Sequence, residues 1–473
     1  MKCNIKISVS LHQHHLLPVL LTCVFSMIYG VMPGQKKTTA AVRAPGILKA
    51  AVVKVDITPE TPKMLLGYSA RQSTGVHDRL YHRIIALDDG LKQFFLVSSD
   101  ICVVSPSEYD HIASMLQKQL GIDPLNFWWS LTHTHSAPEV GVPGLPELFM
   151  GERYKHSVDT AYTSMIEQTI IHGITEARKK LVKAKLGVGW GFSNANINRR
   201  AWDIDGLAGG GMNPDGPVDR RIGLMRLDKE DGTPLALIAN YAMHGTVLGP
   251  LNMEISADAP GIVAEYVEEK TGVPLLFING AAGNLAPIYS VYPNAKAGHL
   301  GQFRVLLGDK ILEANKKIIS TTGTVTLFTG AAIVQTPRKS SLTAWPSDLV
   351  KYNRTTKEGI NMVQLPVRFL KINEELAIWS APLELFCEIA SGIRERSPFP
   401  YTFFYGYTNG WLGYLATEKE WPRAGYEVER VSPFTISVEK DLTQAVEGYL
   451  NTEMRNGATD ITKPLPAKTR KHR

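Results

Sequence analysis

The fold is decided by the stretch Phe127-Trp128-Trp129-Ser130-Leu131-Thr132-His133-Thr134-His135-Ser136-Ala137-Pro138. Its aromatic residues favour a buried strand, and the proline, which has no N–H to donate, ends it. On an extended backbone alternate side chains share a face, so we expect His133 and His135 to point the same way, with Cα atoms about 7 Å apart. Such a pair suits a metal ligand beside a proton-transfer partner; the alternative is two hydrogen-bonded histidines beside a loop.

Further polar side chains follow other predicted strands. His244 follows 235–241, Glu384 follows 376–379 and Tyr414 follows 403–407. Active sites of sheet enzymes gather at the C-terminal ends of strands, so we expect these side chains to lie together with His133. Nitrogen and oxygen donors of this kind suit Zn²⁺. Asp100, at another strand end, is either a group that orients a ligating histidine or an ordinary turn-capping residue.

The remaining pattern predicts a mixed α/β fold, a large single catalytic domain of β-sheets packed with helices. Hairpins are predicted at 84–97 and 222–241, and helices at 105–120, 154–180 and 259–271. The glycine-rich stretch 206–216 lacks the strand and helix of a dinucleotide-binding motif, so we predict a mobile loop there. The small residues of 279–287 suit close approach of a substrate or of another backbone.

The chain has 473 residues, of which 44% are apolar and 20% charged, a globular composition. The formal charge of +6 is modest and lies partly in the last eleven residues, 463–473. No zinc-finger, Walker or RNA-binding pattern is present, so we predict no nucleic-acid partner. The oligomeric state is not indicated.

The N-terminus has the pattern of a secretory signal. Lys2 and Lys6 precede the apolar run 16–29, which predicts a signal peptide at 1–30 or, as the alternative, a signal anchor. We therefore expect export to the periplasm or the extracellular space. A linker at 31–47, a hydrolase domain at 48–453 and a basic tail at 454–473 complete the predicted organisation. Cys102 and Cys387 are expected as buried free thiols, with one disulfide as the alternative.

From about residue 48 to about residue 450 the chain resembles the neutral (non-lysosomal) ceramidase family. The resemblance rests on separated motifs in the family's order: Val55-Asp56-Ile57-Thr58-Pro59, Gly75-Val76-His77-Asp78, Thr132-His133-Thr134-His135-Ser136-Ala137-Pro138, Asn198-Arg199, Asn240-Tyr241-Ala242-Met243-His244, Ile255-Ser256-Ala257-Asp258, Pro382-Leu383-Glu384, and 409–414. The chain is expected to end after the catalytic region, without the family's C-terminal immunoglobulin-like domain.

The resemblance implies the roles of the site residues. A catalytic Zn²⁺ would be held by His133, His244, Glu384 and Tyr414, with Tyr426 as the rival of Tyr414. His135 would transfer protons, Arg199 would stabilise an oxyanion, Asn284 would be catalytic, and Asn409 and Tyr426 would bind substrate. These residue types suit amide hydrolysis, because a zinc-bound water has a pKa of about 7 and an imidazole can protonate the departing amine.

One residue departs from the family pattern. Ala286 stands where the family carries a serine implicated in catalysis. Three readings stay open: a metal-bound water acts without a hydroxyl, the substrate differs, or activity is lost. We therefore expect an exported zinc hydrolase of a lipid-like amide such as an N-acylsphingosine, with transient membrane-surface contact. The alternatives are another amide or ester substrate, or an impaired lipid-binding protein; no Gly-x-Ser-x-Gly elbow supports a serine hydrolase.

Overall fold

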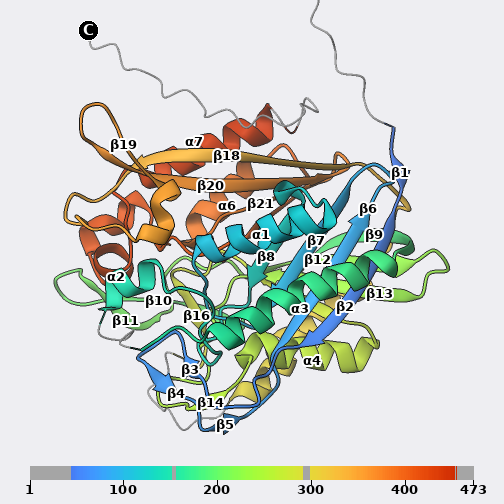
Figure 1. Cartoon of the computed structure of the whole chain (residues 1–473), viewed down its shortest axis with the longest axis horizontal. Coiled ribbons are helices and arrows are strands. Elements are labelled where there is room, and N and C mark those ends of the chain that lie inside the picture. Colours follow the sequence, from blue (N-terminus) through green and yellow to red (C-terminus); the bar gives the residue numbers. More distant parts are fainter. Residues whose placement is uncertain (1–43, 152–155, 291–298, 453, 455–473) are drawn as a thin grey trace, which may run out of the picture. The chain divides into compact units, whose positions relative to one another are not determined.

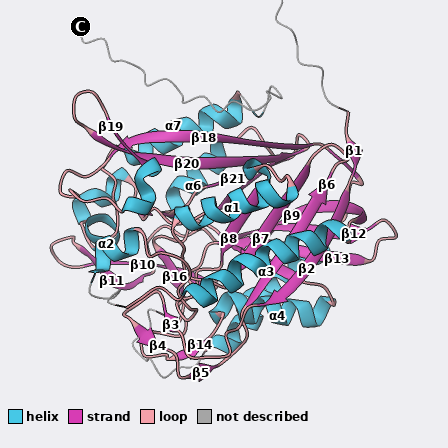
Figure 2. Ribbon diagram, in the orientation of Figure 1, coloured by secondary structure: helices cyan, strands magenta, loops and turns pink. Residues whose placement is uncertain are grey.

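The structure is a computed structural model that describes residues 44–151, 156–290, 299–452 and 454. Sheets and helices combine as expected of a mixed α/β protein (Figures 1 and 2). The largest sheet has eight strands in the order β15-β13-β12-β9-β2-β6-β7-β8. These strands are β2 (Lys49–Asp56), β6 (Tyr81–Asp88), β7 (Gln93–Ser99), β8 (Phe127–Leu131), β9 (Val182–Phe192), β12 (Arg221–Lys229), β13 (Pro234–Tyr241) and β15 (Leu275–Asn279). Both predicted hairpins, β6–β7 and β12–β13, are confirmed as antiparallel pairs.

The two edges of this sheet approach each other. The Ser98 hydroxyl of β7 donates to the Phe277 carbonyl of β15 at 2.6 Å, and the Asn279 side chain donates to the Thr132 carbonyl at 3.3 Å. Strand β13 runs parallel to β15, and β8 runs parallel to β7. The C-terminal ends of β8 and β13 therefore meet, although six strands lie between β8 and β15 in the sheet order.

A second sheet packs on the first. It contains β18 (Leu327–Pro337), β19 (Asn353–Thr355), β20 (Asn361–Ile372), β21 (Leu376–Ser380) and β23 (Tyr401–Tyr405), with β21 and β23 parallel. Trp128 of the first sheet meets Tyr405 of the second edge-to-face, with ring centroids 6.3 Å apart. Beyond the second sheet, β22 (Glu384–Leu385) and β24 (Tyr414–Leu415) form a short parallel pair.

Helices cover the sheets. α3 lies across β2 and β6 in Figure 1. It begins at Thr160, later than the predicted residue 154, because the Asp159 carboxylate caps it by accepting from the Tyr162 N–H. The others are α1 (Pro106–Leu120), α2 (Leu145–Met150), α4 (Asp258–Thr271), α5 (Lys310–Lys317), α6 (Cys387–Arg396) and α7 (Val438–Asn451). None of the helices in the described part of the chain has the length and apolar character that a membrane crossing requires.

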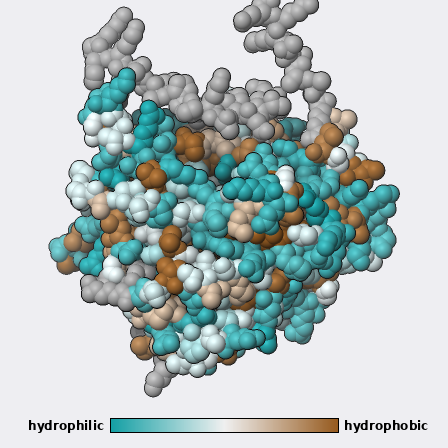
Figure 3. All heavy atoms as spheres, viewed as in Figure 1, coloured by the Kyte–Doolittle hydropathy of each residue, from teal (hydrophilic) through white to brown (hydrophobic). Residues whose placement is uncertain are grey.

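Short elements complete the fold. The remaining strands are β1 (Gly46–Ile47), β3 (Met64–Leu65), β4 (Arg71–Gln72), β5 (Gly75–Val76), β10 (Asn196–Trp202), β11 (Ala208–Asn213), β14 (Glu254–Ile255), β16 (Leu285–Pro287) and β17 (Thr324–Val325). Segments of 3-10 helix are η1 (Pro124–Asn126), η3 (Leu300–Gln302), η5 (Ser347–Tyr352) and η6 (Glu418–Arg423), and π-helices are η4 (Arg304–Asp309) and η7 (Tyr426–Arg430). On the face shown in Figure 3, hydrophobic residues are scattered among polar ones.

The prediction of a mobile loop at 206–216 is wrong for its central part, because β11 pairs antiparallel with β10 and its backbone groups enter that ladder. Cys102 and Cys387 are buried free thiols, as predicted. The signal peptide at 1–30, most of the linker and nearly all of the basic tail lie outside the described residues, so the domain boundaries stay a prediction.

Candidate metal centre

Two histidines and a glutamate converge in the interior. Glu384 Oε2 lies 3.3 Å from His133 Nε2 and 3.0 Å from His244 Nε2. One ligand atom from each of the three residues falls within 4.8 Å of the others, and all three side chains are buried. The structure therefore brings together residues that follow three different strands.

The pairing of His133 with His135 has a different cause from the one predicted. Strand β8 stops at Leu131, and His133 is left-handed, with φ 62°, so the alternation of an extended strand does not apply. The two rings nevertheless meet, with the Nε2 atoms 3.1 Å apart. The backbone N–H of His133 donates to Ile101, and that of His135 donates to Gly245.

Close backbone packing places His244 beside this pair. Thr134 and Gly245 form an isolated parallel bridge. A Cβ at position 245 would lie 2.8 Å from the His133 carbonyl oxygen, which is too close for any side chain. Glycine after His244 thus lets the two histidine segments run side by side.

Hydrogen bonds orient both imidazoles. His133 Nδ1 lies 3.0 Å from the Cys102 carbonyl, and His244 Nδ1 lies 2.8 Å from the Leu285 carbonyl. A carbonyl can only accept, so each Nδ1 carries a hydrogen, and each Nε2 of a neutral ring directs its lone pair toward Glu384. Lone pairs and a carboxylate facing one point are the donor set of a cation, and nitrogen with oxygen ligands fits Zn²⁺.

The electrostatics agree with this assignment. Burial lowers the pKa of His244 to about 4. Burial also disfavours charge on His133, but the Glu384 carboxylate outweighs it and raises the pKa of His133 to about 10. Although burial opposes its charge, Glu384 has a pKa well below its usual range because of His133. The buried carboxylate therefore needs a positive partner, either a proton on His133 or a metal cation that takes its place.

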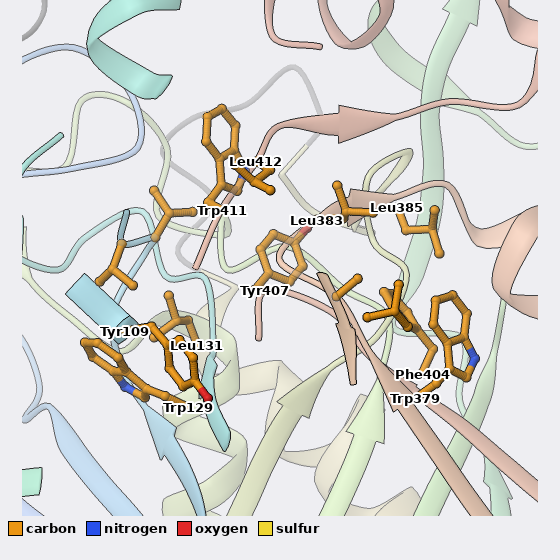
Figure 4. Packing of buried hydrophobic residues seen from close by; sticks show 14 of the residues in the cluster. Tyr109, Trp129, Leu131, Trp379, Leu383, Leu385, Phe404, Tyr407, Trp411 and Leu412 are labelled. Atoms are coloured by element: carbon orange, nitrogen blue, oxygen red, sulfur yellow. The ribbon is translucent and has the colours of Figure 1, made fainter. Parts of the chain in front are cut away.

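Two aromatic side chains donate hydrogen bonds to the Glu384 carboxylate. The Tyr407 hydroxyl donates to Oε2 at 3.1 Å, and the Trp411 indole donates to Oε1 at 2.8 Å. The Tyr407 ring also stacks on His133, with centroids 4.2 Å apart. In Figure 4 Tyr407 lies between Trp411 and Leu383 on one side and Leu131 on the other. Tyr407 was not predicted from the sequence, where its only signal is a phenol close to the end of a strand that leads to the site.

Tyr414 and Arg199 complete one side of the cluster. The Tyr414 hydroxyl lies 3.3 Å from His244 Nε2 and accepts from Arg199 Nη2 at 3.0 Å. Arg199 is held by the Gly283 carbonyl and by Glu427, each at 3.0 Å. Burial raises the pKa of Tyr414 well above its usual value, while Arg199 opposes that rise. Tyr426 stands farther out: it is 39% exposed, and its ring centroid lies 5.9 Å from that of Tyr414.

His135 lies at the edge of the cluster. It is 9% exposed, more than the other two histidines, and its ring contacts Tyr68 at 4.8 Å. Burial, followed by the neighbouring His133, lowers its pKa well below the usual value, so the ring is neutral. Its Nδ1 has no hydrogen-bond partner among the described residues. Its position at the edge of the cluster, and not its lowered pKa, makes His135 the imidazole placed to exchange a proton with a substrate.

The side chains of the other predicted residues hydrogen-bond groups other than the candidate ligands. The Asn284 side chain donates to Glu388 at 2.7 Å and accepts from the Cys387 N–H at 2.9 Å, at the start of α6. Asn409 accepts from the Trp129 N–H at 2.8 Å. The hypothesis that Asp100 orients a histidine is wrong, because its carboxylate binds the Arg83 guanidinium and the Tyr81 N–H.

The loop at 279–287 packs against another backbone, one of the two alternatives drawn from its small residues. A Cβ on Gly283 would lie 2.5 Å from the Glu384 carbonyl oxygen. Ala286 of this loop is buried and pairs with Ile197 of β10. The loop therefore supports the segment that carries Glu384.

Comparisons with known proteins all find similarity to neutral ceramidases. Residues 49–277 match the family described as neutral/alkaline non-lysosomal ceramidase, N-terminal. Neutral ceramidase B of Dictyostelium discoideum is 27% identical over 262 residues, which cover 51% of this chain and 34% of that protein. Neutral ceramidase A of the same organism is 29% identical over 46% of this chain and 31% of its own length. The alignments thus span about a third of these relatives.

The fold matches over a longer range. The crystal structure of neutral ceramidase from Pseudomonas aeruginosa superposes with a TM-score of 0.71, covering 90% of this chain and 77% of that one at 18% identity. A structure described as ceramidase complexed with C2 gives a TM-score of 0.72 at 17% identity. This likeness establishes the fold.

Proposed function

We propose that this chain, which through residues 49–277 belongs to the neutral/alkaline ceramidase family, is a zinc-dependent hydrolase of an amide bond. The observation that carries the proposal is the buried convergence of His133 Nε2, His244 Nε2 and Glu384 Oε2. Tyr414 is the fourth candidate ligand, because its hydroxyl faces His244.

Bound Zn²⁺ would supply a water of lowered pKa and polarise the amide carbonyl. Residues of the chain would transfer the proton, stabilise the developing charge and orient the ligand Glu384. Neutral His135, at the edge of the cluster, accepts a proton from the attacking water and delivers it to the departing amine nitrogen. Arg199, whose guanidinium reaches the Tyr414 hydroxyl, supplies positive charge where the carbonyl oxygen becomes negative. Tyr407 and Trp411 hold the Glu384 carboxylate in a fixed orientation.

The substrate we propose is a lipid-like amide of the N-acylsphingosine class, which fits the names of the related ceramidases. We also propose export, and transient contact with a membrane surface where such a lipid resides. Ala286 provides no hydroxyl, so the reaction would proceed without a serine in that place. A different amide or ester, or lipid binding without turnover, remains the second candidate because of this one residue.

The decisive experiment measures zinc content and amide hydrolysis on the same samples. The proteins are the wild type, His133→Ala and the control His111→Ala, whose side chain lies 58% exposed on α1. The substrates include a short-chain fluorescent ceramide and simpler amides and esters. One zinc per chain with turnover, both lost only in His133→Ala, supports the proposal. If zinc is bound without turnover, Ala286→Ser is tested next. Recovery of activity in that variant would identify the missing hydroxyl as the cause. A folded protein without zinc contradicts the mechanism.

A further inference from the structure

A separate cavity of about 220 Å³ is lined in part by Thr408 and Asn409, the two residues that follow Tyr407. Its walls come from α1, η5, β20, β21 and residues 408–409, and no member of the candidate metal set lines it. Figure 1 shows α1, β20 and β21 close to one another. The cavity has its own polar groups, which the proposed hydrolysis does not use.

Two buried donors line this cavity without a protein partner. The Ser380 hydroxyl and the Asn409 side-chain NH₂ make no hydrogen bond among the described residues. Ser380 is fully buried, and Asn409 is 5% exposed. Buried polar atoms in folded proteins are nearly always satisfied, so two such atoms on one cavity call for an acceptor inside it.

A cation stands beside these donors. Arg368 of β20 is directly opposite Ser380 of β21 in the antiparallel register, so their side chains leave the same face of the sheet. The Arg368 guanidinium hydrogen-bonds the Tyr109 side chain, and none of the ion pairs found among the described residues joins Arg368 to a carboxylate. The other charged groups of the wall, Lys351 and Asp110, pair with each other. The wall therefore carries one uncompensated positive charge.

We propose that this cavity binds a small organic anion. Its carboxylate or phosphate oxygens accept hydrogen bonds from Arg368, Ser380 and Asn409. Its apolar part lies against Pro366 and Pro382, which share the lining. Recognition of an organic anion needs both the hydrogen-bond donors and the apolar wall. The donors alone would suit any inorganic anion, and the apolar wall alone any small hydrocarbon.

Isothermal titration calorimetry of the full chain tests this site with four six-carbon compounds. Hexanoate and hexyl phosphate carry the anion from two sources, and hexanol and hexylamine are the uncharged and cationic controls. We expect one anion to bind at one per chain, at least ten-fold more tightly than either control. Hexanoate binding alone identifies a carboxylate, and hexyl phosphate binding alone a phosphate.

Variants locate the binding. Arg368→Met should weaken it at least ten-fold and Ser380→Ala several-fold, whereas Arg304→Met, an exposed arginine of η4, should leave it unchanged. If Arg368→Met fails to fold, Ser380→Ala still tests the site. The Ser380 hydroxyl makes no hydrogen bond among the described residues, so its removal should not disturb folding. The titration is repeated after chelator treatment. A carboxylate that had bound to a metal ion, and not in this cavity, would then no longer bind. No anion binding, equal binding in both variants, or binding that vanishes with the metal overturns the proposal.

Discussion

The Tyr407 hydroxyl donates to Glu384 Oε2 at 3.1 Å while the ring of the same residue stacks on His133, with centroids 4.2 Å apart. One side chain thus positions two members of the candidate metal set. Burial, followed by the charge of Glu384, raises the pKa of Tyr407 well above its usual value. The phenol therefore stays protonated and acts as a donor at any ordinary pH.

Tyr407→Phe should weaken zinc binding about 10- to 100-fold, the usual effect of losing a hydrogen bond to a ligand. The ring and its stacking on His133 remain, so the variant should fold. Zinc affinity is measured by competition with a chromophoric chelator. The matched control is Tyr405→Phe, two residues away, whose hydroxyl contacts Met225 instead. Equal affinities in all three proteins would remove Tyr407 from the site.

Gly283→Ala should destabilise the protein and disturb the metal centre. The added methyl would meet the Glu384 carbonyl at 2.5 Å, a backbone contact that no rotamer relieves. Overpacking of this kind costs about 1–3 kcal/mol of unfolding free energy. Urea unfolding and zinc content report both effects. Gly301→Ala is the control, because nothing lies within 4 Å of a Cβ there; a similar loss in both variants would contradict the explanation.

Arg200→Met should lower the free energy of unfolding, by up to about 3–5 kcal/mol, since it removes the cation that two buried carboxylates share. Among the described residues, Glu427 then keeps only Arg199 as its cation, and Glu420 only Arg423. Arg200 is 2% exposed and bonds Glu420 at 2.9 Å, and Glu427 on its other side. The comparison is Lys183→Met, which breaks the exposed pair with Glu230 and should give no measurable change. Urea denaturation measures both. A loss in Arg200→Met no larger than in Lys183→Met would show that the buried network is unimportant for stability.

Glu108 should make stability depend on pH. Burial, and then the charge of Glu167, raises the pKa of Glu108 to about 7. The folded chain therefore keeps a proton that the unfolded chain, with a pKa of about 4.3, releases. Between about pH 4.5 and pH 7 the unfolding free energy should fall as pH rises, by up to about 1.4 kcal/mol per pH unit from this group.

Urea unfolding from pH 5 to pH 8 measures that slope as a difference between proteins. Glu108→Gln should be less pH-dependent than the wild type, and the exposed control Glu395→Gln should behave like the wild type. Parallel curves for wild type and Glu108→Gln would mean that Glu108 ionises normally in the folded state.

The sequence was most informative where local rules apply. The strand at 127–131, both hairpins and the helix at 105–120 were predicted because strand-forming aromatic residues, turn residues and helical spacing act over a few residues. The start of α3 was missed, since its cap at Asp159 lies inside an otherwise helical pattern. The strand β11 was missed because glycine has no side chain to signal a pairing that its backbone makes.

By itself, the sequence determined which donor types exist and that each follows a strand: His133, His244, Glu384 and Tyr414. Only the tertiary structure decided that they meet. The meeting depends on the approach of β15 to β7 and β8, made by the Ser98 and Asn279 hydrogen bonds, and on the left-handed turn at His133. The structure also places the Tyr414 hydroxyl beside His244 and the Tyr407 hydroxyl against Glu384. Such choices depend on contacts between residues far apart in the chain, which local propensity does not encode.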